Sequence, residues 1–323
     1  HILYGQPPPG LDVRLSLDQE LQATADLLLA QQKGALVLLN AQSGEILAIS
    51  SFPSFDPNQL DQIWSELVEN PDTPLFNRAT LGRYHPGTAL GPFIMAATLE
   101  DGDPPTILND QDLMKDDYSI TCASQPLDSS WSSLISNGCP HSQITLGQSL
   151  GSQRVLDLYN DLGLYSSPSL RLPTDSSPAP LEFSDQGLAY LGLDEVKVNP
   201  LQLALAAATL SNGGVRPAPR LATAVNSPVA GWITLPTLSE SVRVFSNETA
   251  DATALGLQAT NLPIWQTIAV VPNGPDETVT WYIAGTPPNW GGRPLTLVIL
   301  LESDDPTTAE SIGQEIIQTV IGN

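Results

Sequence analysis

The chain of 323 residues has few basic, aromatic and cysteine residues. Lys and Arg total 12 against 35 Asp and Glu, which gives a formal net charge of −23. A surface this acidic repels phosphate backbones and anionic lipids, so the composition argues against nucleic acid as a partner. No apolar run reaches the ~20 residues that a membrane-spanning helix needs, and no secretory signal pattern opens the chain. The hydrophobic content of 41% is instead typical of a globular protein.

Short apolar runs predict hairpins near both ends of the chain. Ala35–Leu39 and Ile46–Ile49 are separated by a turn-forming segment, and their continuous apolar character favours a sheet that is covered on both faces. Near the other end, Ile264–Val271, Val279–Ala284 and Leu295–Leu301 are β-type runs separated by Pro- and Gly-rich turns.

Helical patterns fill most of the middle of the chain. Asp56-Pro57 predicts a helix start, and apolar residues then recur at i, i+3, i+4, i+7 and i+8 from Leu60 to Val68. Residues 88–100, 144–163 and 199–212 also have helical character, whereas residues 103–143 are irregular. Terminal hairpins around a helical middle predict an α+β fold built on one antiparallel sheet.

Several segments resemble the transpeptidase domain of class B penicillin-binding proteins. They occur in the order expected for that family, from about residue 12 to residue 321. The segments are Gly34–Asn58, Pro74–Ala79 with Tyr84–Gly87, Asn199–Ala204 with Ser211–Gly214, and Trp281–Gly285. The resemblance implies the penicillin-binding/β-lactamase-like fold, with an antiparallel sheet flanked by helices and a mostly helical subdomain.

This resemblance also suggests how the domain is organised. Residues 1–16 are expected to form an extended lead-in, followed by a single transpeptidase-like domain over residues 17–323. Within it, we expect a sheet subdomain over about 17–55 and 215–323 and a helical subdomain over about 56–214.

The three catalytic motifs of the family are degenerate in this chain. The family uses Ser-x-x-Lys, Ser-x-Asn and Lys-Thr/Ser-Gly. The first maps to Thr88 and Gly91, and the second is placed at Ser149 and Gly151. The third falls in the apolar run that contains Ala269, Val270 and Val271. An amine three residues after a hydroxyl shares its helix face and activates it, and Gly91 supplies none.

Other groups are candidates for replacing the lost base. The chain has three lysines, Lys33, Lys115 and Lys197, and none lies within four residues of a motif position. His85 or His141, with Asp101 or Asp112, would form a Thr–His arrangement with Thr88, but histidines scattered along the sequence are weak support for it. The alternative of an active acyltransferase that uses Thr88 or Ser149 with an unusual base therefore stays open.

The sequence predicts neither a cofactor nor a metal ion. Asn109–Asp112 alternates oxygen ligands but lacks the glycine and terminal glutamate of a calcium loop, so a solvated acidic loop is the better interpretation. Cys122 and Cys139 are candidates for a disulfide, which would suit an oxidising compartment, and separate buried thiols are the alternative.

The resemblance and the motif losses together predict a catalytically inactive module. Its expected partners are peptidoglycan or a protein of cell-wall synthesis or division, on the outer side of a bacterial cytoplasmic membrane. Contact with the membrane is expected only through an anchor outside this sequence. A purely structural spacer with an acidic, soluble surface is a further alternative.

Overall fold

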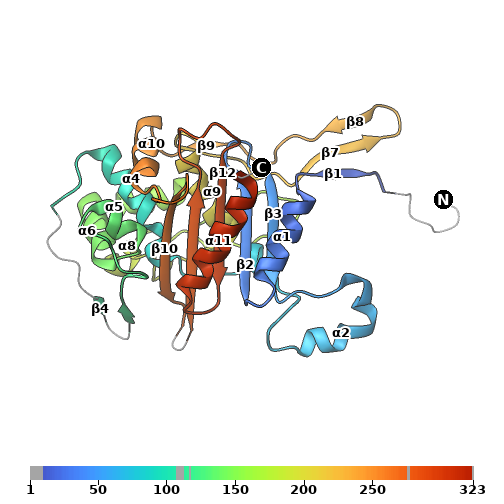
Figure 1. The fold of residues 1–323 in the computed structure, drawn as a ribbon, viewed down its shortest axis with the longest axis horizontal. Coiled ribbons are helices and arrows are strands. Elements are labelled where there is room, and N and C mark those ends of the chain that lie inside the picture. The colour runs from blue at the N-terminus through green and yellow to red at the C-terminus, as the bar shows by residue number, and fades with distance from the viewer. Residues whose placement is uncertain (1–9, 107–112, 116–117, 275–276, 322–323) are drawn as a thin grey trace.

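A five-stranded antiparallel sheet forms the centre of the molecule (Figure 1). The structure is a computed structural model that describes residues 10–106, 113–115, 118–274 and 277–321. The strand order is β10-β11-β12-β2-β3. Strands from the first and the last part of the chain are therefore neighbours, where β12 pairs with β2. The strands are β2 (Gly34–Asn40), β3 (Ile46–Phe52), β10 (Trp265–Pro272), β11 (Thr278–Gly285) and β12 (Leu295–Leu301). Both predicted hairpins and the α+β class are confirmed.

Helices cover both faces of this sheet. α1 (Gln19–Leu29) and α11 (Pro306–Ile321) lie on one face, and α9 (Pro200–Ser211) packs against β12, β2 and β11 on the other. Neighbouring residues on a strand point to opposite faces, so Leu36 belongs to the core beneath α1 and α11, while Val37 belongs to the other core. This double burial explains why the strands are mostly apolar and contain no charged side chains.

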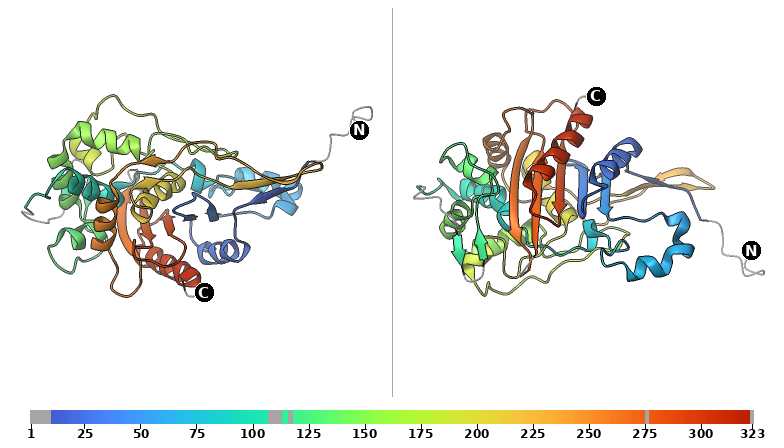
Figure 2. Two further views of the ribbon diagram at one scale, coloured as in Figure 1. Left: turned by 90° about the horizontal axis from the view of Figure 1, so that it is seen from above. Right: turned by 60° about the horizontal axis from the view of Figure 1, so that its bottom comes forward.

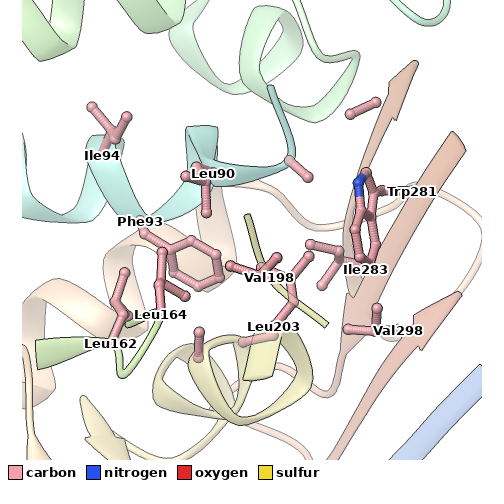
Figure 3. Packing of buried hydrophobic residues seen from close by; sticks show 14 of the residues in the cluster. Leu90, Phe93, Ile94, Leu162, Leu164, Val198, Leu203, Trp281, Ile283 and Val298 are labelled. Atoms are coloured by element: carbon pink, nitrogen blue, oxygen red, sulfur yellow. The ribbon is translucent and has the colours of Figure 1, made fainter. Parts of the chain in front are cut away.

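A group of helices packs against the β10 edge of the sheet (Figures 1 and 2). Its members are η3 (Gly87–Leu90), α4 (Gly91–Asp101), α5 (Trp131–Ser136), α6 (Pro140–Leu150), α7 (Ser152–Asp161), α8 (Gln186–Tyr190) and α10 (Asn247–Gly256). Leu90 and Phe93 from the start of this group, Leu203 from α9 and Trp281 from β11 meet in one core (Figure 3). The large core therefore joins the helices and the sheet.

Three small sheets complete the described strands. β1 (Val13–Leu15) pairs with β7 (Ala222–Ser227), which pairs with β8 (Gly231–Thr234). β4 (Leu113–Lys115) pairs with β5 (Tyr118–Ile120), and β6 (Val215–Arg216) pairs with β9 (Val242–Arg243). The last residues of the expected lead-in are thus extended, since they form β1, and they belong to the projecting sheet of β1, β7 and β8.

The amphipathic helix predicted after Asp56 exists but is not part of the helical group. Asp56 caps the short turn η2 (Pro57–Gln59), and α2 (Leu60–Glu69) follows. α2 lies beyond the β3 side of the sheet, at the opposite end of the molecule from α4–α6 (Figure 1). α3 (Arg78–Leu81) is also not part of the helical group, since it packs on β2, β3 and α9. The expected helical subdomain from residue 56 onward is wrong for this first part. No helix in the described chain is both long and apolar enough to span a bilayer.

Candidate functional site

A tight turn positions Thr88 beside strand β10. Gly87 has φ +58°, and a Cβ atom there would lie 2.3 Å from Val271 Cγ2, so only glycine allows this approach. The indole nitrogen of Trp281 donates to the carbonyl oxygen of His85 at 2.9 Å and fixes the segment before the turn. The sequence thereby holds the turn η3 against the sheet edge.

The hydroxyl of Thr88 is sealed inside the protein. Thr88 is 2% exposed, and its Oγ1 atom has no hydrogen-bond partner among the described residues. A Cβ atom at Gly138 would lie 3.0 Å from Oγ1 and 2.3 Å from Ile268 O, so the Gly138 backbone sits directly between Thr88 and β10.

Gly91 faces a packed wall of side chains. A Cβ atom at this position would lie 3.1 Å from Gln143 Oε1 and 3.1 Å from Ile135 Cγ2. Gln143 is fully buried on α6, and its Nε2 donates to Tyr190 O at 2.8 Å and to Gly87 O at 3.2 Å. Gln143 and Ile135 therefore fill the space that a longer side chain from position 91 would occupy.

Ser149 and Gly151 are not brought to Thr88, and the expected place of the second motif needs correction. Ser149 lies in the last turn of α6, ~13 Å along the helix from Pro140, and its Oγ donates to Leu146 O at 2.7 Å. Gly151 follows with φ +82° and open space around its Cβ position. The segment that faces Thr88 is instead the one around Gly138, before α6. A search of the sequence for a serine could not find this segment, because Gly138 has no hydroxyl group.

The apolar run on β10 is where the sequence places it, beside the turn. Val271 contacts Gly87, and Ala269 Cα lies 3.3 Å from the Cβ position of Gly138. Both belong to the core shared with the helices, while Val270 is half-buried. None of the three side chains can supply positive charge or a hydrogen bond.

The described lysine side chains interact with residues other than Thr88. Lys33 pairs with Asp72 at 3.5 Å and with Glu302 at 3.3 Å. The backbone of Lys115 is described, but its side chain lies outside the described set. Lys197 is close enough to His85 for its positive charge to lower the pKa of the imidazole.

The candidate Thr–His arrangement is not assembled. His85 Nδ1 lies 3.0 Å from Val196 O, and burial, followed by the charge of Lys197, lowers the pKa of the imidazole. Asp101 accepts from Arg154 Nε at 3.1 Å. His141 lies on α6 and makes no hydrogen bond to Thr88, whose Oγ1 is unpartnered.

No cluster of three or more His, Cys, Asp or Glu in the described chain is arranged to hold a metal ion. Asp112 and the acidic segment 109–112, which the sequence assigns to a solvated loop, lie outside the described residues.

A disulfide joins Cys122 to Cys139. Cys139 is the N-cap of α6 and directly follows Gly138, so the bond ties the segment beside Thr88 to residues 120–123. The Ala123 amide also donates to Asn137 O at 2.9 Å. The pairing predicted as a candidate is present, and it reinforces the closed side of the site.

Comparisons with known proteins agree on one family. A sequence model described as the penicillin-binding protein transpeptidase domain matches residues 34–263. The chain is 30% identical over 253 residues to the peptidoglycan D,D-transpeptidase PbpA of Mycobacterium tuberculosis, covering 69% of this chain and 51% of that protein. It is 27% identical over 239 residues to PbpA of Mycolicibacterium smegmatis, covering 68% and 48%. The chain thus spans about half the length of these curated relatives.

Solved structures show the same fold. The imipenem acyl-enzyme complex of penicillin-binding protein A from M. tuberculosis superposes with a TM-score of 0.84 at 25% identity, covering 99% of this chain and 82% of that one. The D,D-transpeptidase domain of a peptidoglycan glycosyltransferase from Eggerthella lenta reaches the same TM-score at 18% identity, covering 97% and 83%. The sheet, the helices around Thr88 and the matched sequence segments lead to one conclusion: the chain belongs to the class B penicillin-binding protein transpeptidase family.

Proposed function

We propose that this domain is a catalytically inactive member of its family and serves as a non-catalytic binding or scaffold module in peptidoglycan synthesis or division. The observation that carries the proposal is the state of Thr88. Its hydroxyl is 2% exposed and has no hydrogen-bond partner among the described residues, and the residue three positions later is Gly91.

Chemistry at Thr88 would lack both activation and access. A hydroxyl becomes a competent nucleophile when an adjacent base accepts its proton. General-base and electrostatic assistance are each worth ~10²–10⁴-fold in rate, and groups that act as a unit fail together when one is lost. Gly91, Gly138 and Val271 lie at or next to the turn that carries Thr88, and none of them carries a polar side-chain group.

Ser149 does not support the active alternative. Its hydroxyl donates to a carbonyl of its own helix, a common arrangement for a helical serine, and a continuous helix separates it from the turn η3. No observation therefore favours a transpeptidase that uses Ser149, although the relatives are named as transpeptidases.

We place the domain on the outer side of the bacterial cytoplasmic membrane. The Cys122–Cys139 disulfide supports this location, because disulfides persist mainly in oxidising, extracytoplasmic compartments. Peptidoglycan, or a protein that builds it, is the partner that the family suggests.

Two measurements on the purified domain test the proposal. With a peptide that ends in D-alanyl-D-alanine, we expect release of the terminal D-alanine at the rate of a no-protein blank. With isolated cell-wall sacculi, we expect the domain to be retained at high salt, where nonspecific charge contacts are screened. D-alanine release above the blank that disappears in Thr88→Val would contradict inactivity. Loss of retention at high salt would contradict peptidoglycan binding, and a protein would then be the remaining candidate for the partner.

A further inference from the structure

Helix α2 displays an apolar stripe that the rest of the described chain covers only in part. At 100° per residue, Leu60, Ile63, Trp64, Leu67 and Val68 lie within one arc of the helix. Leu67 is buried, but Trp64 is 53% exposed and Val68 57% exposed. α2 stands away from the sheet in every view (Figures 1 and 2).

This arrangement is unusual for a helix of its length. A helix of ten residues is marginal in water on its own, and helices in proteins are stabilised mainly by packing of their apolar face. Here Trp64, the largest side chain of that face, and the neighbouring Val68 remain in solvent. Scattered surface hydrophobics need no explanation, but a clustered stripe rimmed by charges is the mark of an interaction surface.

The charges beside the stripe specify what can cover it. On the helical wheel, Asp61 follows Val68 on one side of the stripe and Glu66 flanks Ile63 on the other, with Glu69 beyond. None of these three carboxylates takes part in an ion pair within the described residues, and no Lys, Arg or His occurs from residue 34 to residue 77. Packing two copies of α2 together would bring like charges face to face, which disfavours self-association.

We propose that α2 is a docking site for a cationic amphipathic helix of a partner protein. Leucine-type side chains of that helix would pack on Trp64 and Val68, and its Lys or Arg residues would meet Asp61 and Glu66. This is the complementarity that apolar seam positions and flanking charges provide in paired helices. The inference rests on the exposed face of α2 and is independent of the state of Thr88.

The probe for this proposal is a fluorescein-labelled 14-residue peptide of Leu and Lys with leucines at i, i+3, i+4 and i+7. Its control is a peptide of the same composition whose leucines are spread around the helix. Anisotropy titrations with the domain at 0.15 M salt should show saturable binding of the amphipathic peptide and at least tenfold weaker binding of the control.

Paired variants locate the binding surface. Trp64→Gln with Val68→Gln should weaken binding at least tenfold, whereas Trp232→Gln should leave it unchanged, since Trp232 is 46% exposed on the distant strand β8. Asp61→Asn with Glu66→Gln should weaken binding and flatten its salt dependence. Thermal unfolding of each variant confirms that the domain remains folded.

Three results of the binding measurements would overturn the proposal. They are equal binding of both peptides, full binding by the Trp64→Gln/Val68→Gln variant, and loss of binding in Trp232→Gln. A concentration-dependent dimer in sedimentation that the Trp64→Gln/Val68→Gln change abolishes would also overturn it, in favour of a second copy of the chain as the occupant.

Discussion

At the scale of one residue, the proposed inactivity depends on the buried hydroxyl of Thr88. Native proteins pair most buried polar groups, because leaving one without a hydrogen bond costs about 1–3 kcal/mol. Thr88 Oγ1 and Gln143 Oε1 are both buried without a partner among the described residues, and both lie at the turn η3. The chain retains polar atoms here that contribute nothing to stability.

Replacing Thr88 with valine should therefore not harm the fold. Thr88→Val keeps the shape and removes an unpaired hydroxyl, so we expect the free energy of unfolding to stay unchanged or rise by about 1 kcal/mol. The matched control is Thr267, which is 1% exposed and donates to Ile135 O at 2.9 Å. Thr267→Val should lower stability by about 1 kcal/mol. Chemical denaturation measures both, and a clear loss in Thr88→Val would show that its hydroxyl has a partner.

Restoring a lysine at position 91 should destabilise the protein without creating activity. The side chain would collide with Gln143 and Ile135, and overpacking of a core typically costs 1–3 kcal/mol. Gly291→Lys is the control, because nothing lies within 4 Å of its Cβ position, and it should change stability by less than about 0.5 kcal/mol. Equal stability of the two variants would mean that the space beside Gly91 is open.

His85 should make stability depend on pH in a defined direction. Burial first, and then the charge of Lys197, lowers the pKa of the imidazole in the folded state, so the unfolded chain takes up the proton more readily. The neutral form contributes its stability above the unfolded pKa of about 6.5, and this contribution is lost as pH falls through that value. The stability of wild type relative to His85→Gln should thus decrease between pH 8 and pH 5. A difference that is constant with pH would contradict this.

At the scale of elements, one buried ion pair holds the segment before the turn to the sheet. Arg78 is 1% exposed, and its Nε donates to Glu302 Oε1 at 2.8 Å, just after β12. The Tyr84 hydroxyl donates to the same oxygen at 2.7 Å. Glu302 therefore joins α3 and the start of the site to the end of β12.

Removing this carboxylate should be costly. Glu302→Ala leaves the Arg78 guanidinium buried without its counter-ion, and we expect a loss of about 3 kcal/mol in the free energy of unfolding. Arg83→Ala is the control, since its pair with Asp175 is exposed and worth less than about 1 kcal/mol. Thermal denaturation compares the two, and similar small losses would show that Arg78 finds another partner.

Element prediction from the sequence succeeded where one signal dominated. Continuous apolar runs identified β2, β3, β10, β11 and β12, Asp56 identified the start of the segment that contains η2 and α2, and helical character identified α9. α5 was missed because its six residues contain three serines and are too short for a periodic pattern. The position of α2 was also missed, because periodicity reveals an apolar face but not what covers it.

The site was only partly predictable for a related reason. Thr88, Gly91 and the apolar run on β10 follow from their order along the chain. Gly138 does not, because a glycine offers no side-chain chemistry to search for, and its closeness to Thr88 is visible only in the structure.

At the scale of the whole molecule, the family's fold is present, while we propose that its chemistry is not. The chain superposes on active-family structures with a TM-score of 0.84, and its core and sheet order are intact. At the boundary between the sheet and the helices, Gly138, Gln143 and Val271 pack around Thr88 and the turn η3. A scaffold needs the large core but not the hydroxyl, so the core can persist while the catalytic groups are lost.

Intact-mass spectrometry after exposure to a β-lactam tests this account most directly. Penicillin G should leave the mass of the wild-type domain unchanged, and Thr88→Val should behave identically. A stable increase equal to one penicillin molecule in the wild type that is missing in Thr88→Val would contradict the account, because it would prove that Thr88 is accessible and nucleophilic.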